Sequence, residues 1–187
     1  MLRRLMAAAM VLLMLSCTTT RTGPVERGGI EKLKKFAAEN EMKGLIVRID
    51  KNEGPNPLKI NGLPTVLLVN DKLELLYRQV GYSSRFKKEL KEAIECNTVL
   101  CSLDSEYLKV KSRYAGMYVN DLGLKDLDGG WHRLSRLVKK NSVAVIDIWA
   151  TWCRPCLLVN KDIGELHEEY KGTDVRFVAI NVDKIEE

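Results

Sequence analysis

The sequence predicts an α/β protein in which a central mixed sheet is flanked by helices. Segments with apolar residues at helical spacing alternate with short runs of apolar, strand-forming residues, which is the pattern of a sheet covered by helices. The 187 residues are 45% hydrophobic, 29% charged and 6% aromatic, and this composition excludes a disordered, collagen-like or coiled-coil chain. The length allows one or two small domains.

The charge distribution does not indicate nucleic-acid binding. The net charge of +5 falls to +3 when residues 1–16, which carry Arg3 and Arg4 and no acid, are set aside. Basic and acidic residues are interleaved in the runs 31–35 and 87–92, which is typical of solvated helix faces. We therefore expect no nucleic-acid partner.

Residues 1–16 are predicted to be a lipoprotein signal peptide. A basic start precedes an apolar run at 5–15, which is too short to span a bilayer as a helix. Ser16 followed at once by Cys17 resembles the lipobox of bacterial lipoproteins, in which the Cys is acylated and becomes the first residue. The alternatives are an ordinary cleaved signal and an uncleaved anchor. The lipoprotein interpretation predicts lipidation of Cys17, a polar tether at 17–29, and a protein lipid-anchored to a membrane in the cell envelope, periplasmic or extracytoplasmic.

The segment 30–96 predicts two helices and three strands. Ile30, Leu33 and Ala37 recur at helical spacing, and Phe86, Leu90 and Ile94 do so again. The elements predicted here are a helix at 30–40, strands at 45–49, 65–69 and 73–80, the last two forming a hairpin through Asn70, Asp71 and Lys72, and a helix capped by Ser84.

Residues 97–116 have no clear period and are predicted to be a connector. The segment 117–187 then returns to alternating elements. These are a hairpin that turns at Asp128 and Gly129, a buried strand at 143–149, a helix through Val159, Ile163, Leu166 and Tyr170, and a buried strand at 175–182.

The five cysteines fit an exported thiol protein. A lipidated Cys17 would leave two pairs, Cys96 with Cys101 and Cys153 with Cys156, in a compartment where disulfides persist. Cys96 and Cys101 are a candidate second disulfide, with a redox relay or two free thiols as alternatives. A zinc site built from both pairs is the weaker alternative, because their spacing is a poor match to a zinc ribbon, and we expect no metal.

The C-x-x-C at Cys153 and Cys156 lies between a predicted buried strand and a predicted helix. Unpaired N–H groups at the helix start and the neighbouring Arg154 would stabilise a Cys153 thiolate. Cys156, one turn on, would then attack a mixed disulfide formed on Cys153. A metal half-site or a structural disulfide is the alternative, which the flanking Trp152 and the strand-to-helix context disfavour.

Residues 145–156 (VIDIWATWCRPC) resemble the thioredoxin superfamily, and most closely its exported, membrane-tethered TlpA/ResA-type thiol–disulfide oxidoreductases. The resemblance implies a thioredoxin-like sheet and a buried acid at Asp147, whose raised pKa would suit it to take a proton from Cys156. Local hydrogen bonding is the alternative role for Asp147. The acid that some members carry one turn after the second Cys is replaced by Val159.

Residues 61–95 resemble the cis-proline loop, last two strands and last helix of the same superfamily. That match implies a cis Leu63–Pro64 bond, contact between Pro64 and the C-x-x-C, and pairing of substrate with the backbone of Leu63. A simple turn proline is the alternative. Trp152 and Arg154 complete the predicted substrate-binding set.

The order of these two halves is reversed relative to the family. The cis-proline half, 30–96, precedes the C-x-x-C half, 117–187, and each alone would leave a thin core and a raw sheet edge. We therefore predict that the halves form one circularly permuted domain whose old ends are joined through the connector. The alternatives are a truncated tandem array and two chains that exchange halves.

The predicted function is disulfide reduction in exported proteins by an enzyme without a cofactor other than its redox-active disulfide. A membrane or periplasmic electron donor would be a partner, and we expect a monomer. A non-catalytic thioredoxin-like binding module is the alternative. His132 and His167 are predicted to be surface residues without a matched partner.

Overall fold

The computed structural model describes residues 29–53, 56–98, 114, 116–138 and 142–184. Their strands form one seven-stranded mixed sheet in the order β3-β2-β6-β7-β1-β4-β5. The strands are β1 (Leu45–Ile49), β2 (Thr65–Asn70), β3 (Leu75–Val80), β4 (Gly123–Asp126), β5 (Trp131–Arg133), β6 (Val143–Trp149) and β7 (Val175–Asn181). The helices are α1 (Gly29–Glu39), α2 (Phe86–Thr98), α4 (Leu134–Leu137) and α5 (Arg154–Glu169), with a 3-10 turn at Lys51–Glu53.

β6 lies near the centre of the sheet because its sequence is apolar on both faces apart from one acid. All seven of its residues are buried, as expected of a strand covered on both sides. It pairs antiparallel with β2 and parallel with β7. β1 is parallel to β7, and β4 is antiparallel to β1. The strands of the first part of the chain, β1 to β3, and those of the second part, β4 to β7, therefore belong to one hydrogen-bonded sheet, in which β6 and β7 lie between β2 and β1.

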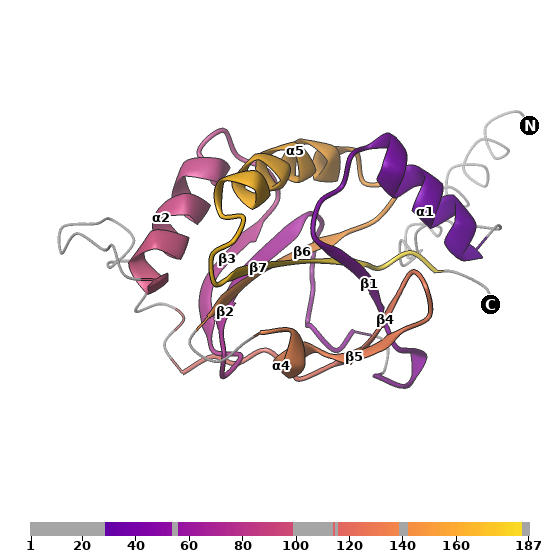
Figure 1. The fold of residues 1–187 in the computed structure, drawn as a ribbon, viewed down its shortest axis with the longest axis horizontal. Helices are drawn as coiled ribbons and strands as arrows, with labels where there is room; N and C mark the ends of the chain where they lie inside the picture. The colour runs from indigo at the N-terminus through magenta and orange to yellow at the C-terminus, as the bar shows by residue number, and fades with distance from the viewer. Residues whose placement is uncertain (1–28, 54–55, 99–113, 115, 139–141, 185–187) are drawn as a thin grey trace, which may run out of the picture.

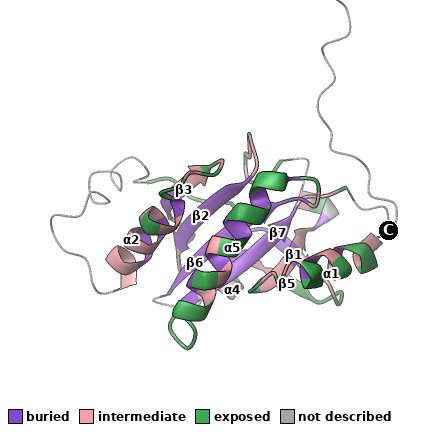
Figure 2. Cartoon of the chain, turned by 90° about the horizontal axis from the view of Figure 1, so that it is seen from above, coloured by how far each residue is buried: buried purple, intermediate pink, exposed green. Residues whose placement is uncertain are grey.

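The three longer helices lie on one face of the sheet, and α4 lies on the other (Figure 1). α2 and α5 pack on the apolar side chains of β2, β6 and β7 that point to this face, including Val66, Val145 and Phe177. α1 covers the next region with Leu33, which packs with Ala179 of β7. Seen from above, each helix presents an exposed outer side and a buried inner side (Figure 2), as the amphipathic pattern of these segments predicts.

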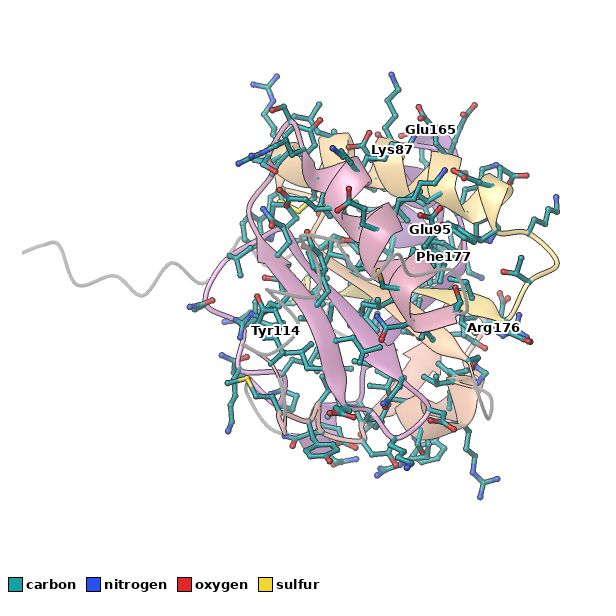
Figure 3. The ribbon with its side chains drawn as sticks, turned by 90° about the vertical axis from the view of Figure 1, so that its left-hand side faces the viewer. Lys87, Glu95, Tyr114, Glu165, Arg176 and Phe177 are labelled. Atoms are coloured by element: carbon teal, nitrogen blue, oxygen red, sulfur yellow. A yellow bond between two sulfur atoms is a disulfide. The ribbon has the colours of Figure 1, made fainter. Side chains whose placement is uncertain are left out.

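α2 and α5 are also joined by ion pairs on their outer sides. Lys87 pairs with Glu165, and Lys91 pairs with Glu169; the first of these pairs is labelled in Figure 3. These side chains are partly exposed, so the pairs orient the helices more than they stabilise the fold.

Most predicted elements are confirmed. The strand at 45–49 and the strand at 143–149 have the predicted bounds, and the β4–β5 hairpin turns through Gly129 at a φ of 90°. The prediction that Ser84 caps α2 is wrong, because the helix begins at Phe86. The N–H of Phe86 donates to the carbonyl oxygen of Ser83 in a preceding turn. The short α4 and the 3-10 turn were not predicted, since three or four residues are too few to show a period.

The histidine prediction is also wrong in part. His132 Nε2 lies 2.7 Å from Asp126 Oδ2, so this histidine has a matched acidic partner across the β4–β5 hairpin. The ring of His167 packs edge-on against Phe177 with centroids 5.3 Å apart. Phe177 belongs to a different element from His167, and the hairpin turn brings Asp126 to His132. The local sequence reveals neither contact.

Candidate active site

A disulfide joins Cys153 and Cys156 where β6 leads into α5. Cys153 is the N-cap of α5, and Pro155 occupies the first turn, where its missing N–H has no cost. The two Cα atoms are 5.3 Å apart. Both cysteines are buried, with 5% and 3% of their surfaces exposed. The predicted pairing is therefore present, and its sulfurs lie at the positive end of the helix dipole.

The disulfide is surrounded by apolar side chains from both parts of the chain. Cys153 and Cys156 pack in one cluster with Leu33 of α1 and Trp149 of β6, and Leu63 packs against it. Phe36 stacks on Trp149 with ring centroids 5.6 Å apart. Leu33 and Phe36 were not predicted to be site residues, because their helical spacing indicates only a buried face.

Asp147 lies on β6 two residues before Trp149, and therefore on the face that carries the disulfide cluster. It is 2% exposed, and its Oδ1 has no hydrogen-bond partner among the described residues. Its neighbours in the sheet ladder are Val66 and Ala179, which carry no charge. Burial in these surroundings raises the pKa of Asp147 from 3.8 to about 7.

The Leu63–Pro64 peptide bond is cis, as the resemblance implies. Pro64 is buried, and its carbonyl oxygen accepts a hydrogen bond of 2.8 Å from the N–H of Gly81. Thr65, the first residue of β2, donates its hydroxyl to the carbonyl of Gly62 at 2.7 Å. These two bonds tie the loop to the start of β2 and to the residue that follows β3. Contact with the disulfide cluster is made through Leu63.

The surface beside the disulfide is exposed and partly apolar. Trp152 is 46% exposed, and Arg154 and Pro155 are also exposed. Leu157 and Leu158, on the next turn of α5, are 38% and 52% exposed. Trp152 and Arg154 were predicted for this surface, but the two leucines were not, because they follow the C-x-x-C without a recognisable motif.

The remaining predicted sites lie at or beyond the limits of the described residues. Cys96 is disulfide-bonded, but Cys101 lies outside the described residues, so their pairing stays a prediction. Cys17 and the connector at 99–113 lie outside them too. Within the described ranges, no group of three or more His, Cys, Asp or Glu residues is arranged to hold a metal ion. No helix in that part of the chain is long and apolar enough to cross a membrane.

Comparison with known proteins finds similarity mainly to thiol-redox proteins. Residues 115–187 match the model of the AhpC/TSA family. The thiol-disulfide oxidoreductase ResA of Geobacillus kaustophilus is 37% identical over 67 residues, which cover 36% of this chain and 37% of the relative. The thioredoxin Asp f 28 of Aspergillus fumigatus is 49% identical over 41 residues, covering 22% of this chain and 36% of the relative.

A mitochondrial relative, thioredoxin-3 of Saccharomyces cerevisiae, is 44% identical over 48 residues, covering 26% of this chain and 36% of the relative. The chain thus spans less than half of the length of the curated relatives it matches. No solved structure matches it with significance. The mixed sheet with flanking helices is consistent with a thioredoxin-like fold, and these matches are similarities to thioredoxins and thiol–disulfide oxidoreductases.

Proposed function

We propose that this protein is an exported, membrane-anchored thiol–disulfide oxidoreductase that reduces disulfides in other exported proteins. The observation that carries the proposal is the Cys153–Cys156 disulfide at the start of α5, packed against the residue that precedes the cis proline. A structural disulfide needs neither the helix N-terminus nor a cis-proline loop beside it. Both features serve a thiolate that reacts with an extended substrate.

The reaction begins with the reduced dithiol. The Cys153 thiolate attacks a substrate disulfide, forms a mixed disulfide and releases one substrate thiolate. Cys156 then attacks the Sγ of Cys153 and releases the second substrate thiolate, so that two electrons pass to the substrate. The protein ends in the oxidised state seen in the structure. A membrane or periplasmic dithiol donor must reduce it again before the next turnover.

Asp147 is the proposed proton acceptor for Cys156. A carboxyl whose pKa is raised to about 7 is partly ionised near neutral pH and can take up a proton there. Val159, which is fully buried, offers no alternative acid one turn after Cys156. We therefore assign the proton transfer to Asp147.

Substrate binding is assigned to the surface that borders the disulfide. Trp152 and Arg154 are exposed and flank Cys153 in the chain, and the loop of Leu63 and Pro64 leads into β2, which pairs with β6. An extended peptide between them would place its disulfide over Cys153 and bring its backbone to Leu63.

A circular permutation accounts for the arrangement of the strands. β6, α5 and β7 form a crossover unit with α5 on the face that carries α1, and β1 lies next to β7 and parallel to it. A direct connection from β7 through α1 to β1 would therefore repeat the hand of the preceding crossover. The end of the described chain after β7 also runs beside the first turn of α1 (Figures 1 and 2), so a short loop would close the ancestral connection.

The membrane anchor of the proposal is a lipid on Cys17. Expression of the full chain in a bacterial host with a labelled fatty acid would test it. Label on the wild-type protein and none on Cys17→Ser supports the anchor, whereas equal labelling contradicts it.

Insulin reduction by the soluble chain 18–187 tests the activity. We expect a monomer that reduces insulin, no activity in Cys153→Ser, and about a tenfold lower rate in Pro64→Ala because the substrate is misplaced over the thiolate. A folded but inactive wild type would favour a non-catalytic binding module. Activity confined to dimers would favour exchanged halves or a truncated tandem protein, and a reduction potential as high as that of a dedicated disulfide donor would overturn the reductase assignment.

A further inference from the structure

The loop that carries Trp152 to the disulfide is held by an acid at the end of the neighbouring strand. The N–H of Thr151 points to the carboxylate of Asp183, with the nitrogen 3.0 Å from Oδ2 and 3.3 Å from Oδ1. The adjoining backbone is tied to the same strand end, because the N–H of Val182 donates to the carbonyl of Trp149 at 3.0 Å. The chain after β6 is therefore bound to the end of β7 both by the Asp183 side chain and by a backbone hydrogen bond.

Asp183 is itself oriented by a buried residue. Asn181, which is 2% exposed, lies opposite Trp149 in the sheet ladder. Its Nδ2 donates to Asp183 Oδ2 at 2.8 Å, and its Oδ1 accepts from the Asp183 N–H at 3.1 Å. The Asn181 amide and the Asp183 carboxylate therefore connect the buried end of β7 to the loop at 150–152 by hydrogen bonds.

We propose that Asp183 is a positioning residue that holds the loop at 150–152 so that Cys153 is presented for attack on a disulfide. This inference rests on the proposed thiol–disulfide exchange. Asp183 acts through Thr151, which is two residues before Cys153, and it touches no reacting atom. Its bond to Thr151 is charge-assisted and hence stronger than a neutral hydrogen bond.

We expect the Asp183 contact to matter most in the reduced protein. In the oxidised state the covalent bond between Cys153 and Cys156 restrains the loop. After reduction that restraint is gone, and the position of Cys153 at the N-cap of α5 depends on the contacts of the preceding loop. Small displacements of a nucleophile reduce its rate strongly, so loss of the Asp183 anchor should slow the reactions of Cys153.

The test measures alkylation of Cys153 by iodoacetamide at neutral pH in the reduced full chain, resolved by site with mass spectrometry. Asp183→Asn and Asp183→Ala remove the same charge, but only asparagine keeps an oxygen that can accept from Thr151. We expect the Asn variant to stay within about twofold of wild type and the Ala variant to react at least about threefold more slowly than the Asn variant. Asp174→Ala, an exposed acid just before β7, is the matched control and should react as wild type does.

Equal rates for the Ala and Asn variants would overturn the proposal, since charge rather than position would then explain the effect. An Ala variant that reacts as fast as wild type would overturn it too. Asp183→Leu, similar in size to asparagine but without an acceptor, repeats the comparison if the Ala variant melts early. Failure of the wild type to reduce insulin would refute the proposed function, and the alkylation rates would still decide the role of Asp183.

Discussion

Replacement of Asp147 by asparagine should stabilise the protein in a pH-dependent way. Asp147 is 2% exposed, and burial raises its pKa from 3.8 to about 7. Each pKa unit corresponds to about 1.4 kcal/mol, so the folded state above neutral pH carries a penalty of about 4 kcal/mol for this carboxylate. The folded state binds the proton more tightly than the unfolded state, so this acid makes the free energy of unfolding fall as the pH rises from 3.8 to about 7. The amide of the Asp147→Asn variant does not titrate, so the variant should not show that fall.

Urea unfolding of the oxidised wild type and of Asp147→Asn between about pH 4 and pH 8 measures the effect. The variant should gain stability relative to wild type as the pH rises, by up to about 4 kcal/mol across this range. The size at any one pH includes the cost of burying the new amide, but the change with pH does not. A difference between the two proteins that stays constant over this range would refute the argument from burial.

Two further changes test how α1 and β1 are held. Leu33→Ala, at a residue 1% exposed beside the disulfide cluster, should lower the free energy of unfolding by about 2–5 kcal/mol because it leaves a cavity; a loss no larger than that of an exposed α1 substitution would show that α1 does not pack there. Gly44→Ala should cost at least about 1 kcal/mol more than Gly172→Ala. Both glycines have positive φ, 87° and 81°, but only the Cβ at position 44 would meet a backbone oxygen, that of Phe177, at 2.7 Å. Thermal melts of both variants check this, and equal losses would contradict it.

The local elements of this protein could be predicted because their signals are local. The apolar run of β6 and the spacing of Leu90 and Ile94 in α2 each lie within a single segment. The C-x-x-C likewise predicted its own disulfide, since a strand, four connecting residues and a helix place the two cysteines side by side. The cis Leu63–Pro64 bond could be predicted only through resemblance, because a proline before a strand is usually trans.

The site residues that sequence analysis missed act over long separations. Phe36 and Trp149 are more than a hundred positions apart, and Asp183 lies far from Thr151 along the chain. Neither contact belongs to a motif. The first depends on β1 lying beside β7 and the second on β7 lying beside β6, so both depend on the order of the strands.

The sequence by itself determined the type of each main helix and strand and the pairing of Cys153 with Cys156, because periodicity, helix-terminus chemistry and spacing all operate within a few residues. The buried acid at Asp147 could be predicted only through resemblance. Only the tertiary structure decided that β1 and β2 from the first part of the chain lie beside β7 and β6 from the second, and so that Leu63, Leu33 and Phe36 surround the disulfide region. Strand order and helix packing arise from apolar surfaces that many residues form together. Those surfaces specify a partner only when the whole sheet is assembled.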